Sequence, residues 1–155
     1  MMRRLLSSLA LSLVCLALGA KELRPTERQS ILGAIRPTAS RMAGQPVRIK
    51  IDRLNVDRGW AVLVGSLASI TGRGIDWSLA ADCAPALDKM LWVVLQKSNG
   101  AWRVKHIEIC APEPPYWNLE QYGGLVWPCG VYSGLETGED ETLEDRCRSQ
   151  VTRTR

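Results

Sequence analysis

The feature that most constrains the fold is a hairpin signal between Met90 and Cys110. Two apolar runs, MLWVVLQK and AWRVKHIEIC, flank the dipeptide Asn99-Gly100. Asn-Gly between β-rich runs favours a two-residue hairpin turn, because both residues tolerate the positive φ that such a turn requires. The sequence therefore predicts an antiparallel sheet with this hairpin at its centre.

Alternation along the hairpin predicts one core face and one mixed face. The predicted core face consists of Leu91, Val93, Leu95, Trp102 and Val104. The opposite face consists of Met90, Trp92, Val94, Arg103, Lys105 and Ile107. We expect the long stems of arginine and lysine to cover part of this mixed face.

The strands before the hairpin are indicated by apolar alternation. Residues 47–56 alternate with a change of parity near Asp52, which predicts a β-bulge, since one extra residue moves the alternation to the other face. The nearly continuous apolar run 60–67 predicts a central strand covered on both sides, in which Gly65 marks a bend or a close approach. Residues 68–88 form a long connection, and such connections in small domains are usually functional or tied down.

A helix is predicted on each side of the strands. Residues 26–36 place their apolar side chains on one face, with a capping box expected at the start. Pro37 should end or kink this helix, because a proline restrains the residue before it, and a short second turn over residues 38–43 can follow before Gly44. Residues 112–155 form an extension rich in proline, glycine and aromatic residues, and 140–151 should be helical, with Thr137 and Asp140 as a capping box.

The first 20 residues have the pattern of a secretory signal peptide. Arg3 and Arg4 precede an apolar run that ends in small residues at 17–20, a cleavage site, and the run is too short and wrongly flanked for a spanning helix. The alternative is an uncleaved anchor. Cleavage would leave residues 21–155 as a single periplasmic or secreted domain. Loss of the two arginines lowers the formal charge from +4 to about +2, which is too small to indicate nucleic-acid binding.

Four cysteines follow the leader. They are Cys83, Cys110, Cys129 and Cys147. An even number in an oxidising compartment predicts two disulfides. None of the spacings is that of a zinc site, and there is a single histidine, so no metal site is expected. Three pairings are possible, and we favour Cys83–Cys110 with Cys129–Cys147, because the hairpin brings Cys83 and Cys110 to the same edge.

Three pieces of the chain carry a resemblance. They are residues 31–47, 54–61 (LNVDRGWA) and 99–104 (NGAWRV). Over residues 24–110 the chain resembles small, exported, uncharacterised bacterial proteins with a cystatin-like or nuclear-transport-factor-like α+β fold. The resemblance implies a helix on a curved antiparallel sheet and supplies no catalytic residues. Ile49 stands where cystatin inhibitors have the glycine of their Gln-x-Val-x-Gly hairpin, so that inhibitory wedge is not implied.

No constellation in the sequence predicts catalysis. His106 is the only histidine and lies in a predicted strand without a nucleophile motif, so a paired strand histidine is the favoured interpretation. An aromatic neighbour such as Trp77 can raise the pKa of Asp76, but a turn hydrogen bond is the simpler role. There is no P-loop, dinucleotide or calcium-loop pattern, so we expect no cofactor and no enzymatic activity.

Aromatic residues are the remaining candidates for function. Tyrosine and tryptophan are enriched at recognition hot spots. The alternative, which carries equal weight, is that the rings close an open flank of the sheet as a second core. The candidate binding residues are Trp77, Tyr116, Trp117, Tyr122, Trp127 and Tyr132.

Together these features predict an α+β domain: an N-terminal helix on a curved antiparallel sheet of about four strands, with a disulfide-linked extension over 112–155 that ends in a short helix. The expected function is an exported, non-enzymatic binding protein of the cell envelope, of the inhibitor or immunity type, whose partner is another envelope or secreted protein. One alternative is a ligand-binding or catalytic pocket of the nuclear-transport-factor-like type, lined by Trp60, Trp92 or Trp102 and His106. The other is a structural envelope protein.

Overall fold

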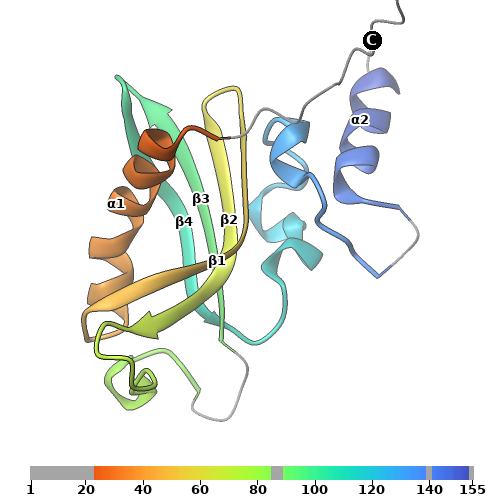
Figure 1. Cartoon of the computed structure of the whole chain (residues 1–155). Helices are drawn as coiled ribbons and strands as arrows, with labels where there is room; N and C mark the ends of the chain where they lie inside the picture. The colour runs from red at the N-terminus through yellow and green to blue at the C-terminus, as the bar shows by residue number, and fades with distance from the viewer. Residues whose placement is uncertain (1–22, 85–88, 139–140, 154–155) are drawn as a thin grey trace, which may run out of the picture.

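The computed structural model describes residues 23–84, 89–138 and 141–153 (Figure 1), so the predicted signal peptide lies outside the described residues. The elements are α1 (Pro25–Met42), β1 (Val47–Asp57), β2 (Trp60–Ser69), β3 (Met90–Ser98), β4 (Ala101–Ala111) and α2 (Leu143–Arg153). The four strands form one antiparallel sheet in the order β1-β2-β3-β4. The predicted α+β class, with a first helix, an antiparallel sheet and a short last helix, is confirmed.

Both faces of the sheet are buried. Figure 1 shows α1 on one side of the sheet and the C-terminal extension, which ends in α2, on the other. The first core lies under α1 and contains Ile31, Leu32, Ile35, Leu63, Leu91, Val93, Leu95 and Trp102 among others. The second core lies under the extension and contains Val62, Val64, Trp92, Val94, Trp127, Tyr132 and Leu143 among others. The predicted mixed face is therefore a second hydrophobic core.

The predicted hairpin forms between β3 and β4. Asn99 and Gly100 have φ angles of 50° and 78°, so both residues of the turn adopt the left-handed conformation that the dipeptide favours. The expectation that this hairpin is central is wrong in one respect. The strand order places β2 and β3 in the middle and β4 at the edge.

A β-bulge in β4 changes which side chains face which core. Val94 pairs with His106 whereas Leu95 pairs with Val104, so Lys105 is an extra residue in the strand. Beyond this point Ile107 packs against the first core, and not on the opposite face as alternation predicted. His106 and Glu108 lie opposite Val94 and Trp92, which belong to the second core.

The predicted bulge in β1 and the close approach at Gly65 occur at the same place. The pairing of β1 with β2 shifts between Ile51 and Arg53, which makes Asp52 the extra residue. Gly65 pairs with Ile51, and a Cβ atom at Gly65 would overlap the carbonyl oxygen of Lys50. A side chain is therefore excluded at this position by the backbone of the neighbouring strand.

Helix α1 is longer than predicted and begins differently. It continues through Pro37 to Met42, because the buried side chains of Ile35 and Ala39 hold this part of the helix on the sheet while Pro37 lies on the exposed side. The expected capping box is absent: Arg24 is the N-cap without a side-chain hydrogen bond, and Pro25 occupies the first turn, where its fixed φ suits a helix.

Both predicted disulfides are present. Cys83–Cys110 ties the connection after β2 to the end of β4, and Cys129–Cys147 joins the short helix η4 (Cys129–Tyr132) to α2. The predicted cap of the last helix is replaced by Thr142, whose hydroxyl oxygen accepts a hydrogen bond from the amide of Asp145 at 3.2 Å. Asp140, the other half of the predicted box, lies outside the described residues.

Two glycines provide a test of the sheet packing. Gly65→Ala should lower the free energy of unfolding by about 1–3 kcal/mol, because its methyl group would collide with backbone. Gly74→Ala is the matched control: a Cβ there meets nothing within 4 Å in the described part of the chain, and the change should be within about 0.5 kcal/mol. Urea denaturation of both variants measures the difference. Equal effects would mean that β1 and β2 are not paired in this register.

Candidate functional site

The aromatic extension forms part of the protein interior. Tyr132 is fully buried and Trp127 is 5% exposed. The Trp127 ring lies 6.3 Å from that of Trp92 and 6.0 Å from that of Tyr132, measured between centroids. The aromatic residues of the extension were expected to be either binding residues or a second core. The burial of Trp127 and Tyr132 favours the second core. Trp117 differs, because it is 49% exposed. Its indole N–H donates a hydrogen bond to the carbonyl oxygen of Glu136 at 3.0 Å.

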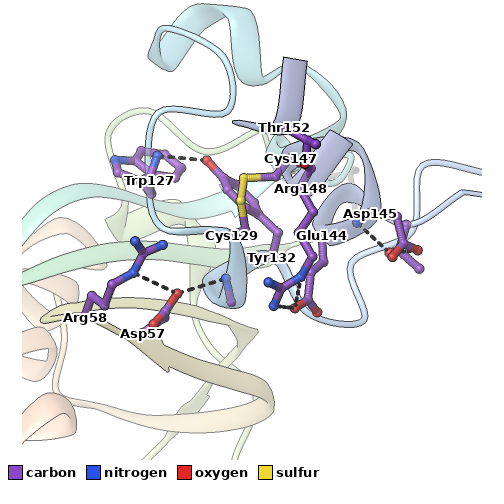
Figure 2. The surroundings of a disulfide bond; sticks show 12 residues. Asp57, Arg58, Trp127, Cys129, Tyr132, Glu144, Asp145, Cys147, Arg148 and Thr152 are labelled. Carbon is purple, nitrogen blue, oxygen red and sulfur yellow. Dashed lines mark hydrogen bonds and ion pairs between the residues drawn. A yellow bond between two sulfur atoms is a disulfide. The ribbon is translucent and has the colours of Figure 1, made fainter. Parts of the chain in front are cut away.

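Two polar side chains of β1 hold the extension on the sheet. The Asn55 amide donates to the carbonyl oxygens of Val131, at 3.0 Å, and Ser133, at 2.7 Å. The Asp57 carboxylate accepts a hydrogen bond from the amide of Gly130 at 3.1 Å, beside the Cys129–Cys147 bridge (Figure 2). Each bond satisfies a backbone group of an irregular segment, which lacks the repeating partners of a helix or sheet. Sequence reasoning missed this role of Asn55 and Asp57.

All three tyrosines lie in this second core, and each has a raised pKa. Burial raises the pKa of Tyr132 to about 12. Burial, and then the carboxylate of Glu108 that accepts its hydroxyl hydrogen bond, raise the pKa of Tyr122 above its ordinary range. Burial also raises the pKa of Tyr116. The neutral phenol is therefore the form that the folded protein favours at all three positions.

His106 lies beside two aromatic rings of the extension. It is exposed on β4, and its ring lies 5.1 Å from the ring of Tyr122 and 5.9 Å from that of Trp127. Glu108 lies two residues further along β4, and its carboxylate accepts a hydrogen bond from the Tyr122 hydroxyl. Within the described ranges, no hydrogen bond joins His106 to a carboxylate.

Asp76 forms hydrogen bonds within a turn, which is the role that the sequence favoured for it. Its carboxylate accepts hydrogen bonds from the Ser78 hydroxyl, at 2.6 Å, and the Ser78 amide, at 3.0 Å. These two bonds lower the pKa of Asp76, with the hydroxyl as the larger cause. The possibility that Trp77 raises this pKa is thus contradicted.

The six candidate binding residues do not form one surface. Trp77 packs against the first core, and the Lys89 ammonium lies 5.8 Å from the centre of its ring. The five aromatic residues of the extension belong to the opposite side of the sheet, where the rings of the second core lie. Their role as binding residues stays a prediction, and Trp117 is the one that offers substantial surface to a partner.

A groove of about 440 Å³ lies elsewhere, where β4 ends. Its walls are the end of α1, the segment around Asp82 and the carboxyl half of β4. The lining residues are Arg41, Met42, Ala81, Asp82, Cys83 and residues 107–112. The side chain of Ile107 packs on the first core, whereas that of Glu108 points to the second. Neighbouring side chains of a strand lie on opposite faces of the sheet, so a groove that touches both residues follows the edge of β4.

Exposed apolar side chains gather at this end of the molecule. Met42 in the groove is 38% exposed, and Leu79 and Ile70 are 54% and 55% exposed. The backbone of Leu79 lies against Gly44, just beyond Met42, and Ile70 directly follows the last residue of β2. The Gln45 side chain fixes this loop by donating to the Asp76 carbonyl at 2.7 Å and accepting from the Asp76 amide at 3.2 Å. No pattern in the sequence marked these residues as a site.

Charge is distributed unevenly between the two halves of the chain. Residues 23–111 contain 13 lysines and arginines against seven aspartates and glutamates, whereas residues 112–155 contain four against eight. The part that forms the helix and sheet is thus basic, and the extension on the other side of the sheet is acidic. The groove itself is lined by one basic side chain, Arg41, and two acidic ones, Asp82 and Glu108, so the excess of basic residues lies outside its lining.

The fold and the groove together define a cross-linked α+β domain with a groove at the end of its edge strand. Comparison of the chain with protein-family models, curated proteins and solved structures found no match. Within the described ranges, no helix is long and apolar enough to cross a membrane. In the same part of the chain, no group of three or more His, Cys, Asp or Glu side chains is placed to hold a metal ion.

Substitution of Trp127 and of Trp117 tests which parts of the extension are core and which are surface. Trp127→Ala should lower the free energy of unfolding by about 3–5 kcal/mol, because it leaves a cavity in the second core. Trp117→Ala should cost less than about 1.5 kcal/mol, since it removes a half-exposed ring and one hydrogen bond. Chemical denaturation measures both. A larger loss for Trp117→Ala would show that the extension packs differently.

The tyrosines predict a loss of stability at high pH. In the unfolded chain they ionise near their ordinary pKa of 10, whereas in the folded chain Tyr132 ionises near 12. The contribution of Tyr132 is therefore complete below pH 10 and is lost as the pH rises from about 10 to 12, by up to about 1.4 kcal/mol per pH unit. Tyrosinate absorbance at pH 10 should be lower in the native chain than in denaturant, because folding raises the pKa of each tyrosine. Ordinary ionisation in the native chain would contradict their burial.

Proposed function

We propose that this chain is an exported, non-enzymatic binding protein of the cell envelope, of the inhibitor or immunity type. It binds another envelope or secreted protein through the groove beside β4 and the apolar side chains next to it. The observation that carries the proposal is the group of exposed apolar residues, Met42, Ile70 and Leu79, at one end of a cross-linked scaffold. Exposed apolar side chains beside a groove are typical of protein interaction sites.

Export is supported by two features. The leader has the composition of a signal peptide. The two disulfides are compatible with a periplasmic or extracellular protein, because disulfides persist in oxidising compartments. The arrangement of one helix followed by four antiparallel strands is compatible with the cystatin-like and nuclear-transport-factor-like resemblance, which we retain as a proposal.

A contact surface has more support than a reaction centre. Both faces of the sheet are filled with side chains, and the groove at its edge is lined by none of the residues expected for an internal pocket, which were Trp60, Trp92, Trp102 and His106. The cysteines in the groove are joined as a disulfide, and the Glu108 carboxylate accepts a hydrogen bond from Tyr122.

A comparison of three baits tests this function and its location. The wild-type mature chain, the double variant Met42→Asp/Leu79→Asp and the control Trp117→Ser are immobilised and exposed to envelope extract. We expect the wild type and the control to retain the same protein and the double variant to lose it, since the new charges lie beside the groove. Circular dichroism and melting verify that all three are folded.

Two outcomes would contradict the proposal. Retention of no protein by the wild type argues against a protein-binding function. Loss of the partner on Trp117→Ser, with retention by the double variant, would move the contact surface to the aromatic extension.

A further inference from the structure

We propose that the groove binds an extended peptide segment of the partner, which adds to the free edge of β4 as a fifth strand and places an acidic group at Arg41. This inference rests on the proposed binding function and specifies its recognition mode. In strand addition, backbone hydrogen bonds to a sheet edge supply affinity, and the side chains on either side of the strand supply specificity.

The geometry of β4 provides the edge. β4 is the last strand of the sheet, so its outer side has no neighbouring strand among the residues that the structure describes. The groove touches six consecutive residues, 107–112, and therefore runs along their backbone. The pairing of β3 with β4 is also irregular here, because Trp92 pairs with Glu108 whereas Met90 pairs with Ala111. This bulge opens toward β3 and leaves the outer side of the strand, where the groove lies, available to another segment.

The amino half of β4 is less suited to pairing. Arg103, Lys105 and His106 are exposed there, and the bulge at Lys105 interrupts the strand. Charged side chains and bulges are features by which edge strands resist association with other strands. From Ile107 onward the exposed charges give way to partly or fully buried apolar residues at Ile107, Ile109 and Ala111, so the open edge is restricted to the groove.

The walls of the groove favour an extended segment over a second copy of this chain. Cys83 is bonded to Cys110, so residues 81–83 are fixed beside the end of β4. Arg41 and Met42 at the end of α1 form the other wall. If two copies paired along their β4 strands, these walls of one copy would meet the same walls of the other. A single flexible strand can enter between them.

The charges in the groove define the chemistry of the segment. The Arg41 side chain is exposed and forms no ion pair or hydrogen bond within the part of the chain that the structure describes, which leaves its guanidinium available for a carboxylate. Asp82 and Glu108 also line the groove. The Glu108 carboxylate accepts a hydrogen bond from Tyr122, whereas the Asp82 carboxylate repels a second acid close to it. We therefore expect an apolar segment whose acid lies at Arg41.

The experiment uses a phage-displayed library of random dodecapeptides selected on the folded mature chain. Selected peptides are synthesised, and their dissociation constants are measured by fluorescence polarisation. Met42→Asp and Arg41→Glu should each weaken binding at least tenfold. Arg28→Glu is the matched control on the same helix, outside the groove lining, and should change binding less than threefold. Methylation of alternate peptide backbone nitrogens should weaken binding at least tenfold, and the amides of residues 107–111 should gain protection from hydrogen exchange.

Three results would overturn the inference: no peptide is enriched, the selected peptides bind Met42→Asp and wild type equally, or N-methylated peptides bind as well as unmodified ones. Failure of strand addition can be distinguished from failure of the proposed binding function. If the partner retained from envelope extract depends on Met42 and Leu79 but leaves residues 107–111 unprotected in hydrogen exchange, protein binding stands and strand addition fails.

Discussion

The burial of the sheet on both faces is the constraint on which the rest of the structure depends. The central strands carry apolar side chains on both sides, for example Leu63 toward α1 and Val62 toward the extension. A single helix covers one face only. The free energy of leaving Val62, Val64, Trp92 and Val94 in water would be several kcal/mol, at roughly 1.5–3 kcal/mol for each large apolar side chain. The extension removes that cost, which explains its aromatic composition and its disulfide.

Bulges in the edge strand connect this packing to the proposed binding site. The extra residue at Lys105 turns His106 and Glu108 toward the second core and Ile107 toward the first. The irregular pairing near Ala111 then lies where β4 forms a wall of the groove. The Cys83–Cys110 bridge ties another part of the groove lining to β4, so the proposed binding of a partner would require little ordering of this segment.

The site was less predictable than the fold. Spacing left three pairings of the cysteines open, and hairpin geometry favoured the pair Cys83–Cys110 that the structure contains. The aromatic residues were visible in the sequence, but composition does not distinguish a ring in a core from a ring at an interface. Met42, Leu79 and Arg41 carried no signal, since their importance comes from the meeting of α1, a loop and the end of β4, three segments far apart in the chain.

The sequence by itself determined two local features, the Asn99-Gly100 turn and the bulge near Asp52, because each depends on steric properties of a few neighbouring residues. It left Gly65 as a bend or a close approach, and it left three pairings of the cysteines open, of which the favoured one is present in the structure. Only the tertiary structure decided that α1 continues through Pro37 and that Lys105 forms a bulge, since packing on the sheet overrides local preference there. It also decided that the second face of the sheet is a core, because long-range burial is a property of the folded chain as a whole.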